Sequence, residues 1–439
     1  MIKPLNQNGG LALTFFFVII ALLATLATWF CFSPHALAAD YKLLTSVATS
    51  YAYNDNILLT DENVLSDSIY TVAPKLEWTR NGERLSAKVD GTAEWYRYQD
   101  NDEYDDTDQW YNAILSYRPT ERWQLEMQGH ASDDNRPDRD IETTGMVLKN
   151  TRRKRFNTSA TASYIFSEVT SGGIFAALNR EDFDDPETSD RRDYSIFLFM
   201  NRSLEAWIAR TTGHMNAGFS HYNFDREYDF TKSAGSYDFT YMLDDEYTVD
   251  NYSFTLGTES ALSEKLNFSI DLGGRYSQSE SESMSRQRIS LYSMETDPLK
   301  ESESYSSWGA VGTLEISYQG ERSNASLLVS HDLTPVSGEN GTANRTTVRI
   351  GGSMKLLEKL RGNVAFQWYQ NKSDKEDSTQ NDIDTQTWNF QTGIRWELNR
   401  KAAISGKYFY TIYDKREAGT TAERNKFLIQ VVAEHDWLE

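Results

Sequence analysis

The stretch RLSAKVDGTAEWY, from Arg84 to Tyr96, decides the fold, because apolar and polar side chains alternate along it without a break. Successive side chains of an extended chain point to opposite faces. One face carries Leu85, Ala87, Val89, Gly91, Ala93 and Trp95, and the other carries Ser86, Lys88, Asp90, Thr92, Glu94 and Tyr96. The first face requires an apolar environment, and the second, which is rich in charge, requires water.

The same alternation recurs in 18 segments, most of them 10 to 14 residues long. A strand of a soluble protein usually has about five or six residues, whereas a tilted strand crosses a bilayer in roughly 9–11. The lengths therefore predict transmembrane strands. The predicted spans are 42–53, 69–79, 84–98, 109–118, 122–132, 154–166, 171–180, 193–202, 207–222, 250–260, 265–277, 305–318, 323–332, 344–355, 361–371, 384–397, 401–413 and 424–437.

The connections between these segments alternate between short and long. Short ones such as NGER and LSEK carry turn residues, and long ones such as QDNDEYDDTD, NREDFDDPETSDRRD and NKSDKEDSTQND are polar and acidic. Outer-membrane barrels have short periplasmic turns and long extracellular loops, and their sheet closes because an open edge would leave backbone groups unpaired in lipid. We therefore expect an all-β, closed antiparallel transmembrane β-barrel of about 18 strands. A large secreted β-protein is the alternative fold.

Composition agrees with a barrel. Only 39% of the residues are hydrophobic but 13% are aromatic, and the formal net charge is −21. A barrel needs no separate core, which fits the low hydrophobic content, and Trp and Tyr near the strand ends predict two interfacial girdles. The acidic balance argues against nucleic acid as a partner.

The first 38 residues have the features of a secretory signal peptide. A short positive start is followed by the apolar stretch from Leu11 to Phe32, and small residues stand at Ala36 and Ala38. We expect residues 1–38 to be removed and residues 39–439 to form the barrel, a retained anchor being the alternative. The single cysteine, Cys31, would leave with this segment, so disulfides and thiolate metal sites are not expected.

Three stretches, SYAYNDNILLTDENVLSD from Ser50, RNGERLSA from Arg80 and EWYRYQDND from Glu94, carry a resemblance to a known family. They resemble the outer-membrane β-barrel porins that accompany exopolysaccharide-assembly and exosortase gene clusters in Gram-negative bacteria. By analogy with 18-stranded polysaccharide exporters such as the alginate exporter, the resemblance implies passage of a polymer. It supplies no site residues. The chain departs from the usual aromatic barrel end, because Leu438 and Glu439 follow Trp437.

Strand alternation predicts which charged side chains face the lumen. The pore-lining candidates are Lys88, Asp90, Glu94, Glu126, His130, Arg210, His214, Asp271, Arg275, Glu315, Arg349, Arg395, Glu397 and Lys407. Their signs are mixed, whereas a pore selective for anions would carry rings of Arg or Lys. Two interpretations stay open: these residues pair across strands and stiffen the wall, or they line a hydrated conduit for neutral or weakly charged glycans.

Two long connections, Asn223–Asn251 and Gln278–Tyr305, are the candidates for narrowing the lumen. The first repeats YDFT at Tyr228 and Tyr237 around KSAGS and reads as a hairpin that either stands above the barrel or folds in as a constriction. One of the two connections is expected to narrow the pore, and extracellular lids are the alternative. A third connection, Asp100–Asp108, is acidic. Its carboxylates are expected to form solvated negative surface, with Ca²⁺ binding as the alternative, because their spacing does not match the calcium loop of an EF-hand.

The basic run TRRKRF begins the sixth predicted strand at the extracellular rim. Arg152 and Lys154 should face outward, where they would contact lipopolysaccharide phosphates or serve as general interfacial anchors. Arg153 and Arg155 should face inward.

No enzyme, metal or cofactor is expected, because the histidines after residue 38 are scattered over different strands. The sequence predicts a Gram-negative outer-membrane pore for export of a polysaccharide, supplied by a separate periplasmic protein. The alternative is a non-conducting surface barrel, an adhesin or scaffold that acts through its acidic loops.

Overall fold

The computed structural model describes residues 39–147, 150–234, 237–289, 294–295, 299–373 and 382–438. The predicted signal peptide, residues 1–38, and most of the acidic connection from 371 to 382 lie outside this part of the chain. None of the described helices has the length and apolar character that crossing a membrane would require.

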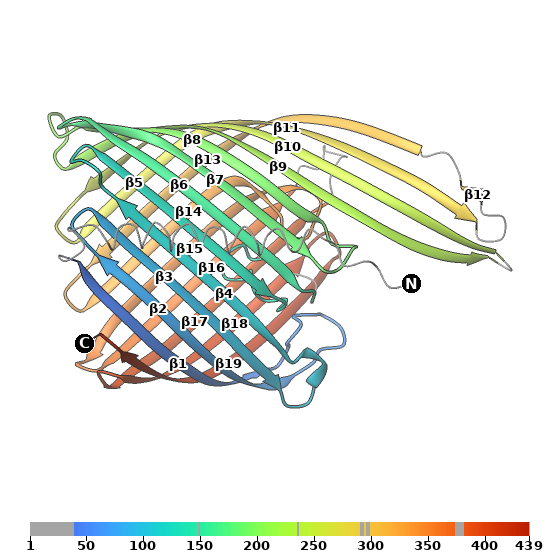
Figure 1. Cartoon of the computed structure of the whole chain (residues 1–439), viewed down its shortest axis with the longest axis horizontal. Coiled ribbons are helices and arrows are strands. Elements are labelled where there is room, and N and C mark those ends of the chain that lie inside the picture. Colours follow the sequence, from blue (N-terminus) through green and yellow to red (C-terminus); the bar gives the residue numbers. More distant parts are fainter. Residues whose placement is uncertain are drawn as a thin grey trace.

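Eighteen long strands form one closed antiparallel sheet (Figure 1). The first strand pairs with both the second and the last, so the sheet closes into a barrel and the predicted fold class is confirmed. The first nine strands are β1 (Asp40–Asn54), β2 (Asp67–Asn81), β3 (Leu85–Tyr98), β4 (Asp106–Tyr117), β5 (Trp123–Asp134), β6 (Arg153–Ser167), β7 (Thr170–Phe183), β8 (Asp190–Ser203) and β9 (Thr211–Ala234). The others are β10 (Tyr237–Ala261), β11 (Leu266–Ile289), β13 (Leu299–Gln319), β14 (Ser323–Pro335), β15 (Thr342–Leu357), β16 (Leu360–Lys372), β17 (Asp384–Asn399), β18 (Ala402–Lys415) and β19 (Thr420–Asp436), with the two-residue β12 (Met294–Glu295) beside the end of β11.

Short and long connections lie at opposite ends of the barrel. Residues 82–84 and 358–359 are examples at the end that we call the short-turn end, whereas 55–66 and 135–147 lie at the long-loop end. Each predicted strand overlaps an observed one, so the alternation of connection lengths follows from the sequence as expected.

The outer face of the barrel is apolar. Large apolar side chains are exposed along the strands, including Tyr51, Leu76, Trp95, Leu198, Leu256, Ile394 and Ile429. Aromatic pairs gather near both ends: Trp123 and Tyr164, with ring centroids 4.9 Å apart, lie near the short turns, and Tyr51 and Tyr70, at 5.3 Å, lie near the long loops. This is the pattern expected of a wall that faces lipid between two interfacial girdles.

The two long connections, one of which was expected to narrow the lumen, are strands over their described residues and form no inward constriction there. Residues 223–234 and 237–251 continue β9 and β10, and most of 278–305 continues β11 and β13. These four strands have 21 to 25 residues, against 12 to 17 in the other long strands, and β9 to β11 extend far past the rim (Figure 1). The hairpin predicted for Asn223–Asn251 is therefore confirmed in the form that stands above the barrel, because the period-two pattern continues through these polar stretches. We call this projecting sheet the flap.

Candidate functional site

Two segments fold inward and fill the lumen at the long-loop end. The first, the plug loop, connects β5 to β6 and is described over 135–147 and 150–152. The second, the hairpin tip, is the connection Val336–Gly341 between β14 and β15. Together they form what we call the plug, and neither segment was singled out from the sequence.

The plug loop crosses the lumen and binds the opposite wall. Its backbone carbonyls accept hydrogen bonds from β15 and β16: the Arg349 guanidinium donates to Thr143 at 2.8 Å, and the Asn371 amide donates to Thr144 at 3.1 Å. The Tyr369 hydroxyl donates to the carbonyl of the residue before Thr143. These strands lie across the ring from β5 and β6, so the loop spans the barrel.

Gly145 allows the loop to lie this close to the wall. Its φ is +70°, a conformation that favours glycine, and the Thr387 hydroxyl donates a hydrogen bond to its carbonyl. A Cβ at this position would lie 2.5 Å from the Cβ of Tyr369. Only glycine therefore fits without displacing either the loop or the strand.

A buried cluster of charges fixes the base of the plug loop. Three arginines on strands, Arg153, Arg155 and Arg191, meet three carboxylates, Asp134, Asp140 and Glu181. The Arg153 guanidinium lies 2.7 Å from Asp140 of the loop and 3.2 Å from Asp134. Buried ions are stable only when paired and hydrogen-bonded, so these pairs tie the loop to the wall. The inward orientation predicted for Arg153 and Arg155 is confirmed.

The hairpin tip joins the same cluster from the other side. The Ser337 hydroxyl donates a hydrogen bond to Glu181 at 2.9 Å, and the backbone N–H of Ser189 donates to the carbonyl of Gly338 at 3.3 Å. The tip therefore reaches from β14 and β15 to the connection between β7 and β8.

Apolar clusters complete the plug. The two plug segments meet in a cluster of Met146, Val336, Ala343 and Ile383. In a second cluster, Ile141 of the plug loop packs with Leu59 of the connection after β1, Tyr413 of β18 and Ala422 of β19. A third cluster, Tyr222, Phe224, Tyr247, Val249 and Leu333, packs the base of the flap against β14. In the described part of the chain these apolar clusters lie at the long-loop end, where a hollow barrel would have none.

Asp138 of the plug loop meets two cations of β19. Its carboxylate lies 2.7 Å from the Arg424 guanidinium and 3.5 Å from the Lys426 ammonium. Burial alone would raise the pKa of Asp138, but Lys426, Arg424 and Arg136 together hold that pKa well below its usual range. The group therefore stays ionised at neutral pH.

The short-turn half of the lumen is hydrated by comparison. There the Lys88 side chain is 42% exposed and pairs with Glu77 at 3.1 Å, and Lys75 pairs with Asp90 at 3.5 Å. In the long-loop half Arg153 is 2% exposed. The inner wall is thus more exposed toward the short turns than at the long-loop end, where the plug covers it.

The structure places most of the predicted lumen residues on the inner face. Asp90, Glu126, Glu315, Arg395, Glu397 and Lys407 lie toward the short-turn end, as does the pair His214 and Asp271, whose side chains approach to 3.5 Å across Gly257. Glu94 and Arg349 contact the plug, through Arg136 at 3.7 Å and the Thr143 carbonyl, and His130 bonds Asn112 at 2.8 Å. Their role as lining of a conducting pore stays a prediction.

Arg210 is the exception. The predicted strand 207–222 begins only at Thr211, so Arg210 lies in the turn between β8 and β9 with a φ of 55° and is exposed. The apolar residues Trp207 and Ile208, which suggested an earlier strand start, belong to this turn.

The cations of the basic run pair with carboxylates of β4, β5 and the connection after β7. Arg152 binds Asp106 at 2.9 Å and Asp133 at 2.6 Å, and the exposed Lys154 lies 3.8 Å from Asp184. Asp106 and Asp108 belong to β4 rather than to a solvated loop, and Asp108 is buried 3.1 Å from Arg136. Contact of Arg152 and Lys154 with lipopolysaccharide stays a prediction. A phosphate bound there would share Arg152 with Asp106 and Asp133, and Lys154 with Asp184.

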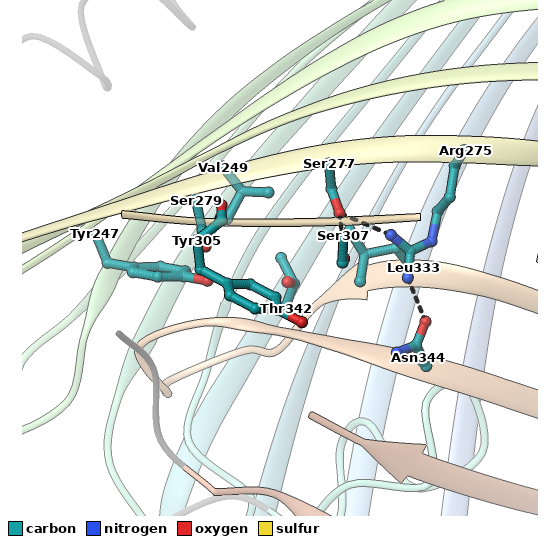
Figure 2. Close-up of a pocket in the computed structure, with 10 residues that line it drawn as sticks. All are labelled: Tyr247, Val249, Arg275, Ser277, Ser279, Tyr305, Ser307, Leu333, Thr342 and Asn344. Atoms are coloured by element: carbon teal, nitrogen blue, oxygen red, sulfur yellow. Dashed lines mark hydrogen bonds between the residues drawn. The ribbon is translucent and has the colours of Figure 1, made fainter. Parts of the chain in front are cut away.

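A small pocket lies where the flap leaves the barrel (Figure 2). Tyr247 and Tyr305 lie at one end and Arg275 at the other. Arg275 donates to the Ser277 hydroxyl at 2.8 Å and to Asn344 at 2.5 Å, which joins β11 to β15 beneath the flap. Arg275, predicted to line the pore, is therefore a buried link between the flap and the hairpin.

Comparison with known proteins gives no family. No family model matches the chain, and no curated protein matches it. Similar solved structures include the unliganded ferric citrate transporter FecA, with a TM-score of 0.43, 12% identity, and coverage of 86% of this chain and 60% of that one. OccAB3 of Acinetobacter baumannii (TM-score 0.40, 9% identity, 91% and 100% coverage) and OccK2 of Pseudomonas aeruginosa (0.41, 9%, 91% and 98%) are also similar. These scores are too low to support an argument about function.

Proposed function

We propose that the chain is an outer-membrane conduit that rests closed, with the plug as its gate and a polysaccharide as its exported substrate. The short-turn end would face the periplasm and the long-loop end the cell exterior, as is general for such barrels. The observation that carries the proposal is the filling of only the long-loop half of the lumen. A barrel of 18 strands is wide enough to leave an aqueous channel unless protein fills it.

The contacts of the plug support a gate rather than a permanent core. The plug loop is bound largely by hydrogen bonds to its carbonyls and by ion pairs, and both kinds of contact can be exchanged for water or ligand. Its apolar clusters are small, four residues each. A polymer that enters at the short-turn end would reach the plug after passing the exposed half of the lumen.

The choice of a polysaccharide as substrate rests on the family resemblance and on the mixed charges of the inner wall. The wall of the short-turn half carries paired charges of both signs, such as Lys88 with Glu77, and hydrated side chains such as Glu315. Such a surface offers hydrogen bonds to a polymer along the lumen, and its mixed charges do not select substrates of one charge sign.

A non-conducting surface barrel is the second candidate, and the filled long-loop half is the observation that favours it. In that case the plug would stay in place permanently, and the flap and acidic loops would bind a partner outside the cell.

Efflux of labelled polysaccharide from proteoliposomes separates the two candidates. The plug-less variant has residues 137–147 and 336–341 replaced by short Gly–Ser linkers. We expect wild-type liposomes to retain both a labelled linear polysaccharide and small ions, and plug-less liposomes to release both. Heat-modifiable electrophoretic mobility would establish that each barrel is folded.

Release of ions without polymer from plug-less liposomes would replace the polymer conduit with a small-solute pore. Retention of both by a folded plug-less barrel would overturn the conduit and favour the surface barrel.

A further inference from the structure

The barrel wall has a seam between β13 and β14. β13 pairs with β11 over Leu299–Tyr318, but with β14 only over Gly312–Gln319. β14 in turn pairs with β15 along its whole length. Beyond Gly312 and its partner His331 both strands continue, each paired with its other neighbour and not, in the described residues, with one another. The ladder that closes the barrel on this side therefore stops part-way along the wall.

The seam begins within the apolar band of the outer face. Gly312 lies in one row of paired residues with Leu256 and Leu272, which are both exposed on that face. Four residues further along β13, Trp308 packs on Tyr276, and these rings mark the membrane interface at the long-loop end. At about 3.3 Å per residue, the seam follows roughly 13 Å of strand below that interface. In the orientation proposed above, this is the outer leaflet.

Beyond the seam the two sides of the wall overlap instead of joining. Leu333 of β14 packs against Tyr247 and Val249 of β10, beneath the flap. The Arg275 guanidinium of β11 donates to Asn344 of β15 at 2.5 Å. The end of the β14–β15 hairpin is therefore a second layer inside the base of the flap, with the small pocket between the layers (Figure 2).

The edge of β13 at the seam needs a partner. Lipid offers none to backbone N–H and C=O groups, so an uncovered strand edge is costly within the hydrocarbon. Among the described strands, residues 306–311 have only β11 beside them in the ladder. The overlap that covers them is held by side chains, at Leu333 and between Arg275 and Asn344, so the layers can part without breaking a backbone ladder.

We propose that the seam is a lateral portal through which an amphiphile of the outer leaflet, with an alkyl chain and a polar head, enters the space beneath the flap. The alkyl chain lies along Leu272 and Ala310, which face outward in the apolar band. The head lies between the parted layers, where Ser277 and Ser307 offer hydroxyls as donors and acceptors and Arg275 offers a cation. This route goes beyond the polymer conduit, because it does not cross the plug loop.

The test is the labelling of single cysteines in proteoliposomes of the folded mature chain, which has no other cysteine once Cys31 has left with the signal peptide. Ser307→Cys lies at the seam, and Ser195→Cys in β8 is the matched control. Both serines belong to the same row of paired residues on the inner face. Each is also hydrogen-bonded to a serine of the next strand, Ser307 to Ser277 at 3.0 Å and Ser195 to Ser220 at 2.8 Å.

The probes are N-hexadecylmaleimide, which is an amphiphile dissolved in the bilayer, and water-soluble N-ethylmaleimide. The ratio of their rates corrects for the reactivity of each thiol. We expect Ser307→Cys to react with both reagents, and Ser195→Cys to react only with the water-soluble one. Mass spectrometry of the intact chain measures both rates, and heat-modifiable mobility establishes that each variant is folded.

A second substitution tests whether the overlap controls entry. In the Ser307→Cys background, Asn344→Ala removes the acceptor of Arg275 and should raise the ratio about tenfold, the loss of one hydrogen bond to a charged group. Asn112→Ala is its control, because that amide bonds Asp90 at 3.0 Å and His130 at 2.8 Å in a continuous part of the wall.

Equal ratios at the two cysteines would overturn the portal. Equal effects of Asn344→Ala and Asn112→Ala would overturn it as well, because the alkyl reagent would then reach Ser307 without parting the layers. Polymer efflux from plug-less liposomes does not require the seam to open. Failure of the portal would therefore leave the conduit untouched.

Discussion

Asp138 connects the plug loop to β19 through Arg424 and Lys426. The charged residues two positions before and after it, Arg136 and Asp140, contact other parts of the barrel. Arg136 lies over the Tyr96 ring and pairs with Asp108, and Asp140 enters the cluster around Arg153. Alternate charged residues of one short loop therefore bind different parts of the wall.

At the residue scale, Asp138 should stay effective in mildly acidic medium. Its depressed pKa means that the carboxylate stabilises the docked loop fully above its ordinary value of 3.8, and that this stabilisation is lost as the pH falls through the lower folded value. The difference in conductance between wild type and Asp138→Asn should therefore be constant from pH 7 to about pH 5. A difference that disappears already near pH 6 would contradict the pairing.

Gly145→Ala should favour the open state of the gate while leaving the ion pairs of the plug loop unchanged. The positive φ and the overlap with Tyr369 together cost on the order of 2 kcal/mol or more, which shifts the closed–open equilibrium at least tenfold toward open. Single-channel recordings should show more open time. Gly129→Ala in β5 is the control, because a Cβ there meets nothing within 4 Å, and equal behaviour of the two variants would contradict the docking.

At the scale of elements, the flap and the plug are separable. The flap meets β14 through the cluster around Leu333, but its outer part, beyond Arg226 and Asp245, extends away from the barrel. Replacing residues 227–244 by an Asn–Gly turn should therefore leave conductance unchanged. Raised conductance in this variant would mean that the flap also closes the lumen.

The strands could be predicted from the sequence because each satisfies a local rule. Alternation with a period of two decides which side chain faces lipid, and it fixed the inward positions of Arg153 and Arg155 as well as the 18 strands. The same reasoning predicts the hairpin of the flap, but not how far β9 to β11 extend beyond the rim.

The plug could not be predicted because it depends on distant contacts. Glu142 and Tyr369 are 227 positions apart, and no local pattern connects them. The plug loop reads as an ordinary polar connection, and its signals are the glycine at 145 and apolar residues such as Ile141, Met146 and Val147. Arg136, Asp138 and Arg424 gain their importance only when the closed barrel brings the connection between β5 and β6 to β3 and β19.

At the scale of the whole molecule, the barrel is asymmetric along its axis: hydrated toward the short turns and filled toward the long loops. The measurement that tests this directly is planar-bilayer conductance of the mature chain beside the plug-less variant, both shown to be folded. We predict small or absent currents for the wild type and large, steady currents for the variant. Wild-type currents as large as those of the variant, or a folded variant that does not conduct, would contradict closure by the plug.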